Sequence, residues 1–161
     1  MTINEERSFS YKTVYFDTPT NEFFLAHHNN KLNRLKIRRR TYINTGTSFL
    51  ELKLKTNKGR TVKKRIKTND IKTFSIEEKN FIHNNTSLNF DEIQPSLTNK
   101  FSRITFVSKD LNERYTIDFD ISFKGKNTRT SLENIVILEI KLDGKNRNSK
   151  ITKLLKESMW I

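Results

Sequence analysis

A period-two alternation of side chains recurs along most of this chain and constrains its fold more than any other feature. Successive side chains of a β-strand point to opposite faces, so such alternation indicates strands. The alternating segments are residues 13–17, 34–41, 50–55, 62–67, 113–123 and 136–142, and residues 101–108 form a further expected strand. We therefore expect about seven antiparallel strands, each with one apolar and one charged face.

Helical patterns are fewer and shorter than the strand patterns. Thr18 and Pro19 are expected to be the N-cap and first residue of a helix ending near His27. A weaker pattern covers residues 70–83, and Ser149 is expected to cap a last helix. The expected fold class is therefore α+β, mainly antiparallel β, with a few short flanking helices.

Length and composition place the chain in a broad class. Its 161 residues, with only four Gly and two Pro, favour one domain over residues 1–161, in which residues 84–99 form a loop. No apolar run is long enough for a transmembrane helix, and the lack of cysteine suits a reducing compartment such as the cytoplasm. The formal net charge of +13 favours a polyanionic partner.

The alternation alone leaves open which way the charged faces point. An open sheet would leave them in water, as half-buried antiparallel sheets usually do. A closed barrel would crowd cations together unless a counter-ion such as a phosphate chain entered, and nearby acids could then hold a divalent metal. The charged faces carry Arg34, Lys36, Arg38, Arg40, Lys53, Lys55, Lys63, Arg65 and Lys141 with Glu51, Asp118, Asp120 and Glu139.

Five segments, in order, resemble those of VTC-type polyphosphate polymerase domains, which belong to the triphosphate tunnel metalloenzymes. The first is the Tyr-Phe-Asp-Thr run at 15–18, and the second is the arginine-rich strand at 34–40. Residues 49–65 resemble the next two strands of the family. The segments Phe101–Thr105 with Arg114–Asp118, and Val136–Lys141, resemble its "Y-x-R-T", "R-x-T-x-D" and "VLEVK" strands.

The resemblance implies an eight-stranded antiparallel barrel, closed around a tunnel lined by inward-facing Lys and Arg. The chemistry it implies is transfer of the ATP γ-phosphate to a growing polyphosphate chain, although some relatives hydrolyse triphosphate or cyclise ATP. It also implies a divalent metal, Mn²⁺ or Mg²⁺. Compared with the family, the chain is expected to lack the first strand and helix and the C-terminal lysine-bearing helix.

The resemblance and the charge pattern together give a candidate site. The expected phosphate ligands are Arg38, Arg40, Lys53, Lys63, Arg65, Arg103 and Lys141, with Arg34, Lys36 and Arg114 as second choices. Glu139 is the expected metal ligand, and Glu51 and Asp118 are expected to assist it or to hold cations in ion pairs. Asp17 is expected to act as a turn or cap residue, and His27 and His28 to be surface or packing residues.

Two other functions compete with the one that the resemblance implies. A basic sheet could bind nucleic acid, but Tyr115, Phe119 and Phe123 are expected on the apolar face, where they could not stack on bases. Nucleic acid is therefore a less favoured partner than ATP, triphosphate or polyphosphate. The chain could also sense phosphate, or be an inactive remnant, and the oligomeric state is left open.

Overall fold

A computed structural model describes residues 7–69, 73–86, 88–109, 111–142 and 149–158. The strands are β1 (Ser8–Asp17), β2 (Arg34–Tyr42), β3 (Thr47–Lys55), β4 (Thr61–Thr68), β5 (Gln94–Val107), β6 (Glu113–Lys124), β7 (Arg129–Leu132) and β8 (Ile137–Leu142). The helices are α1 (Glu22–His28), α2 (Ile76–Asn85) and α3 (Lys150–Ser158), with 3₁₀ turns η1 (Ile43–Thr45) and η2 (Phe90–Glu92). No described helix has the length and apolar character needed to cross a membrane.

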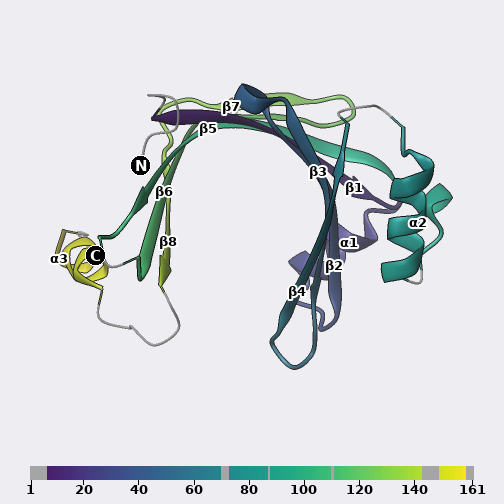
Figure 1. The fold of residues 1–161 in the computed structure, drawn as a ribbon, viewed down its shortest axis with the longest axis horizontal. Helices are drawn as coiled ribbons and strands as arrows, with labels where there is room; N and C mark the ends of the chain where they lie inside the picture. The colour runs from purple at the N-terminus through teal and green to yellow at the C-terminus, as the bar shows by residue number, and fades with distance from the viewer. Residues whose placement is uncertain (1–6, 70–72, 87, 110, 143–148, 159–161) are drawn as a thin grey trace.

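All eight strands join one antiparallel sheet, which curls into a half-barrel (Figure 1). The order is β4-β3-β2-β1-β5-β6, and β6 pairs with β8 along residues 113–118 and with β7 along residues 121–124. The mainly antiparallel α+β class is thereby confirmed. Within the described ranges, β4 pairs only with β3, and β7 and β8 pair only with β6, so β4 forms one edge of the arc and β7 and β8 form the other.

Two strand predictions need correction. The four-residue β7 raises the count among the described residues to eight, because so short a strand shows no clear alternation. The predicted loop at 84–99 is wrong in its last part, where β5 begins at Gln94 and pairs with the end of β1. Its backbone joins that ladder although Pro95 and Ser96 lack an apolar strand pattern.

The hydrophobic core lies on the convex side of the sheet. Ile37, Leu50 and Leu52 project from β2 and β3 into a cluster with Phe16 and with Ile82 of α2. Figure 1 shows α2 outside the arc, beside β2 and β3. The opposite face of these strands, which carries the alternating charges, is therefore the concave face, as the resemblance implies.

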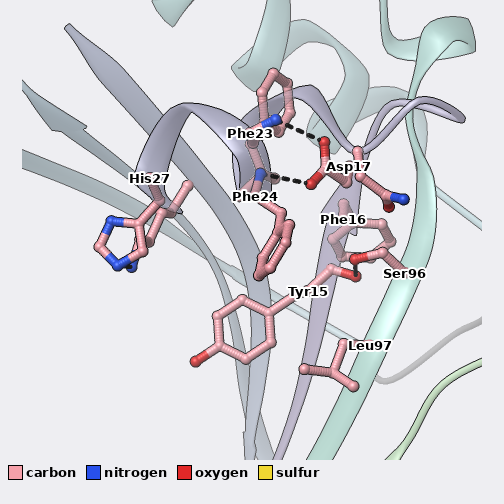
Figure 2. A pocket seen from close by; sticks show the side chains of 11 residues that line it. Tyr15, Phe16, Asp17, Phe23, Phe24, His27, Ser96 and Leu97 are labelled. Carbon is pink, nitrogen blue, oxygen red and sulfur yellow. Dashed lines mark hydrogen bonds between the residues drawn. The ribbon is translucent and has the colours of Figure 1, made fainter. Parts of the chain in front are cut away.

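The first helix begins three residues later than expected. Its N-cap is Asn21, and Thr18 and Pro19 lie in the preceding turn. Figure 2 shows the reason: the buried Asp17 carboxylate accepts hydrogen bonds from the backbone N–H groups of Phe23 and Phe24, at 2.8 and 2.9 Å. The expected capping role of Asp17 is confirmed, and it fixes α1 against the end of β1.

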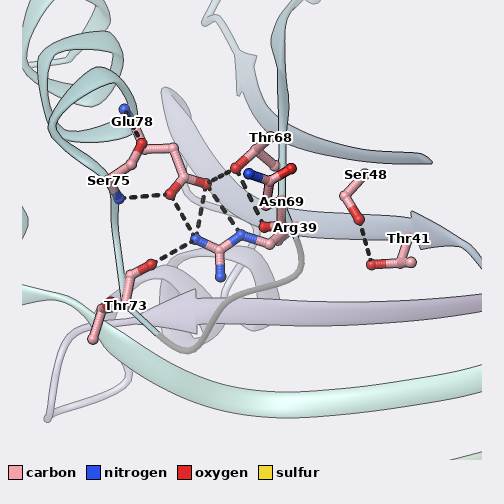
Figure 3. A network of polar contacts seen from close by, with 8 residues as sticks. All are labelled: Arg39, Thr41, Ser48, Thr68, Asn69, Thr73, Ser75 and Glu78. Carbon is pink, nitrogen blue, oxygen red and sulfur yellow. Dashed lines mark hydrogen bonds and ion pairs between the residues drawn. The ribbon is translucent and has the colours of Figure 1, made fainter. Parts of the chain in front are cut away.

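The second helix is tied to the sheet by a buried ion pair, drawn in Figure 3. The Arg39 guanidinium donates to both Glu78 oxygens at 2.8 Å, and the side chains are 2% and 1% exposed. Ser75 and Glu78 cap α2 reciprocally, so the helix begins after Ser75. The predicted helix at 70–83 is thus shifted to Ile76–Asn85, and residues 70–72 of it lie outside the described residues.

The last helix begins as expected. The Ser149 hydroxyl accepts from the Thr152 N–H at 3.4 Å and donates to a Glu113 carboxylate oxygen at 3.1 Å. The same hydroxyl therefore caps α3 and connects the helix to the start of β6.

A bulge in β6 changes the expected faces of that strand. Asp120 has a φ of 52°, and the register with β5 shifts between Lys100 and Ser102. After this shift Phe123 lies opposite Asn99, on the same concave face as Asp118. The prediction of one unbroken apolar face from Tyr115 to Phe123 is therefore wrong beyond the bulge.

Candidate functional site

The strand register gathers the predicted cations on one surface. Directly opposed residues of antiparallel strands share a face, so the pairs Arg38–Glu51 and Glu51–Arg65 bring β2, β3 and β4 together on the concave side. The register likewise places Arg103 beside Asp118 and Arg114 beside Lys141. The concave face carries all the expected ligands: Arg34, Lys36, Arg38, Arg40, Lys53, Lys63, Arg65, Arg103, Arg114, Lys141, Glu51, Asp118 and Glu139.

Glu51 organises the cations of three neighbouring strands. It is 2% exposed, and its two carboxylate oxygens accept from Arg38 at 2.6 Å and from Lys63 at 2.7 Å. Burial alone would raise the pKa of Glu51, but the Lys63 and Arg38 hydrogen bonds and charges together hold this pKa below its usual value. The carboxylate therefore remains ionised and fixes both cations in place.

Arg103 and Asp118 form a second ion pair on the same face. The guanidinium donates to both carboxylate oxygens, at 2.5 and 2.6 Å, in a bidentate arrangement. The hydrogen bond to Asp118 raises the pKa of Arg103, and burial only partly opposes it. The pair holds the guanidinium plane in a fixed orientation.

An aromatic cluster lies under the arginines at one end of the concave face. Tyr11 stacks on Phe101 with ring centroids 5.1 Å apart, and both Arg40 and Arg103 lie over these two rings at 5.2–5.8 Å. Beside them Arg65 covers Phe49 at 4.6 Å. Aromatic rings therefore lie on the charged face as well. The expectation that aromatic residues are confined to the apolar face, which disfavoured nucleic acid as a partner, is thus wrong. These rings are, however, covered by guanidinium groups.

Arg40 is a partly buried cation without a carboxylate partner. Among the described residues it forms no ion pair, and its Nε donates to the Thr13 hydroxyl at 3.2 Å. Burial and then the neighbouring Arg38 lower the pKa of Arg40. A partly buried guanidinium without a counter-charge is stabilised by an anion that reaches it.

Lys36 and Lys53 also lack carboxylate partners within the described part of the chain. Lys36 and Lys53 are register partners on β2 and β3. Burial lowers the pKa of both lysines most, and the repulsion of neighbouring cations lowers it further. With His27, Arg34 and Lys55, they line a cavity of about 160 Å³. This part of the face therefore has a strong excess of positive charge.

His27 joins this cluster, which the sequence did not reveal. Its Nε2 lies 3.1 Å from Lys36 Nζ, and burial and the Lys36 charge lower the pKa of the imidazole. The sequence indicates only that His27 lies in the last turn of the helix whose start Asp17 caps. The contact depends on how Asp17 docks α1 against β2.

The acidic residues of the concave face leave one carboxylate available to a metal ion, so a metal bound here would take most of its ligands from a substrate. Both oxygens of Glu51 and both of Asp118 accept from cations, and no group of three potential metal-ligating side chains occurs among the described residues. Glu139 is about half exposed on the concave face, 3.4 Å from Lys141. It lies opposite Thr116, whose buried hydroxyl lacks a partner in the described structure. One carboxylate plus phosphate oxygens is a common Mg²⁺ arrangement.

A second cavity, of about 430 Å³, lies where β1 ends and α1 begins (Figure 2). Tyr15, Phe24 and Leu97 contribute apolar surface to it, and His27 and Lys36 also line it. Tyr15 and Leu97 are register partners on the concave face. The cavity therefore adjoins the cationic surface through His27 and Lys36, although most of its lining is apolar.

Comparison with known proteins is consistent with this geometry. Among sixteen matching solved chains is a candidate adenylate cyclase from Bacillus halodurans, 13% identical, with a TM-score of 0.60 over 94% of this chain and 75% of that one. Another is a candidate adenylyl cyclase from Hippeastrum with a dominant triphosphatase activity, 11% identical, with a TM-score of 0.52 over the same shares. No curated protein matches the chain.

At such low identity these structures establish the fold alone, and the family comes from the sequence. The model of the VTC domain matches residues 2–160. That match spans the arginine-rich strand, the Glu51 cluster, and the strand of Glu139 and Lys141. The chain therefore belongs to the VTC domain family.

Proposed function

We propose that this chain binds the triphosphate of ATP on its concave face and transfers the γ-phosphate to a polyphosphate chain. The observation that carries the proposal is Arg40, a partly buried guanidinium on the concave face without an ion-pair partner among the described residues. Lys36 and Lys53, with their lowered pKa values, support it. Phosphate oxygens would supply the negative charge that neutralises these three cations.

The two ion pairs give the surface a fixed framework. Arg38 and Lys63 are held by Glu51, and Arg103 is held by Asp118. Guanidinium groups have five N–H donors, so an arginine paired on one edge can still donate to phosphate from another. Phosphoryl transfer depends mainly on such positioning and charge neutralisation. We assign Arg38, Arg40, Lys53, Lys63, Arg65, Arg103 and Lys141 to phosphate binding, and Arg34, Lys36 and Arg114 to its periphery.

The reaction needs no covalent intermediate on the protein. A terminal oxygen of the polyphosphate chain attacks the γ-phosphorus, the bond from that phosphorus to the β–γ bridging oxygen breaks, and ADP leaves. A divalent ion, Mn²⁺ or Mg²⁺, held by Glu139 and by phosphate oxygens, would neutralise charge on the transferring group. A cytoplasmic location belongs to this proposal, since ATP is the substrate.

The test is a turnover assay of the full chain with ATP, a short polyphosphate primer and Mn²⁺. We expect ADP and longer polyphosphate, and we expect Glu139→Gln to lower the rate at least ~100-fold, since a metal ligand is worth several kcal/mol of transition-state stabilisation. The melting temperature and circular dichroism spectrum should be unchanged. Glu133→Gln, an exposed glutamate before β8, is the matched control.

Three results would revise the proposal in different ways. Unaltered turnover in Glu139→Gln would remove this residue from metal binding. Orthophosphate released without chain growth would replace the polymerase with a triphosphatase. Failure of the unaltered chain to bind either ATP or tripolyphosphate would refute the proposal as a whole.

A further inference from the structure

Two cavities of different chemistry meet at the end of the concave face. The larger, of about 430 Å³, has aromatic and aliphatic walls, and the smaller, of about 160 Å³, is lined mainly by cations. His27 and Lys36 belong to both. A ligand that occupied the two cavities together would need an apolar part joined directly to a strongly anionic part.

The walls of the larger cavity leave apolar surface uncovered. Phe24 is 61% exposed and Leu97 is 37% exposed, and both line the pocket together with Tyr15 (Figure 2). The Asp17 carboxylate accepts from the Phe24 backbone N–H at 2.9 Å, which fixes the start of α1, and the Phe24 ring stacks on His28 with ring centroids 5.9 Å apart. Exposed, positioned aromatic surface next to a cation cluster is typical of a binding site.

We propose that this pocket holds the base of a nucleoside triphosphate, stacked against Phe24 and Tyr15, while the triphosphate extends from Lys36 along the concave face. The inference rests on the proposed function, and it deepens that function by giving the base of the ATP donor a binding site of its own, separate from the cations that bind the phosphates. Base stacking on aromatic side chains is tolerant of base identity, and the Asn21 amide in the same pocket adds a donor and an acceptor.

The spacing of the cations suits this arrangement. Residues two apart on one strand face are separated by about 7 Å. A triphosphate that begins beside Lys36 therefore reaches the row of Arg38 and Glu51, where Lys63 also projects. Cationic side chains line this path, whereas Phe24 and Leu97 offer exposed apolar surface. The triphosphate can therefore bind along the cations, and the base can bind against the apolar walls of the larger cavity.

The experiment compares the affinities of the full chain for ATP and for methyl triphosphate, an ester without a base, by calorimetric titration. We expect the unaltered chain to prefer ATP, and Phe24→Ala to weaken ATP binding roughly 5- to 100-fold, as loss of a stacking ring does. Its affinity for methyl triphosphate should not change. Phe24→Trp, which retains an aromatic ring, should retain the preference.

Phe106→Ala is the matched control, because Phe106 is also an exposed phenylalanine but lies on β5 away from this pocket. It should alter neither affinity. Equal affinities of the unaltered chain for the two triphosphates, or equal losses in Phe24→Ala, would overturn the base pocket while leaving the proposed function intact. Absence of binding by either compound would overturn the proposed function and the pocket with it.

Discussion

Arg39 and Arg40 are adjacent arginines with opposite roles. Arg40 faces the concave side without an ion-pair partner among the described residues, whereas Arg39 points into the convex core and pairs with Glu78. The Arg39 guanidinium also lies 5.5 Å from the Phe16 and Phe74 rings. One arginine therefore holds α2 on the sheet, and the other is available to a ligand.

We expect Arg39→Ala to destabilise the chain by about 3–5 kcal/mol, because it leaves the buried Glu78 carboxylate without its counter-charge. Urea unfolding followed by circular dichroism would measure this loss. Arg39→Met combined with Glu78→Leu should cost less than Arg39→Ala, because neither charge then remains buried. Arg114→Ala, at an exposed position, should change stability by less than about 0.5 kcal/mol. A similar small loss in Arg39→Ala would refute this role.

The alternation predicted which charged residues share a face, and the family resemblance predicted that this face is the concave one. Once 34–41 is a strand, Lys36, Arg38 and Arg40 must share a face, whatever the rest of the fold does. The role of Asp17 could be predicted because it acts locally on α1. The contact of His27 with Lys36 could not, since it depends on the angle at which α1 packs against β2.

At the scale of elements, β6 shows where a pattern in the sequence stops being sufficient. Its alternation runs unbroken from Glu113 to Lys124, yet the bulge at Asp120 exchanges the two faces halfway along. A bulge changes the register of backbone pairing without requiring a change in the hydrophobic pattern. The strand itself could be predicted, but the faces of its second half could not.

The bulge also gives an expected effect on stability. Asp120 adopts a φ of 52°, in the left-handed region that L-residues other than Asn and Asp rarely occupy. We expect Asp120→Gly to be neutral or stabilising by up to about 1 kcal/mol, and Asp120→Val to be destabilising by about 1–2 kcal/mol. Chemical denaturation would measure both. Equal stabilities of the Gly and Val variants would show that the bulge is not retained.

At the scale of the whole molecule, the half-barrel brings cations from distant strands toward one another. The pKa of Lys53 on β3 is lowered first by burial, and then by Arg38, by Lys141 of β8 and by Lys63 of β4. Lys141 belongs to the other side of the arc shown in Figure 1. The two sides thus repel across the concave space when no anion lies between them, and a polyphosphate would turn this repulsion into attraction.

The cations that favour phosphate binding repel one another in the ligand-free protein and so lower its stability. Lys53→Met should therefore have opposite effects on stability and on binding. A lysine whose folded-state pKa is lowered binds its proton less well in the folded than in the unfolded chain. Stability of the ligand-free protein should therefore rise as the pH increases through the lowered pKa toward the ordinary value of about 10.4. Lys53→Met should raise the melting temperature near neutral pH by about 1–3 °C and weaken that rise with pH.

The same substitution should weaken tripolyphosphate binding roughly tenfold, because it removes one charge-assisted contact. Tripolyphosphate stabilises the chain by mass action, so its effect on the melting temperature should be smaller in Lys53→Met. Lys124→Met, at an exposed position on β6, should alter neither quantity. A lower melting temperature with unchanged tripolyphosphate affinity would mean that Lys53 is a structural residue. A higher melting temperature with weaker binding would mean that the cations are held together for a ligand at the expense of the fold.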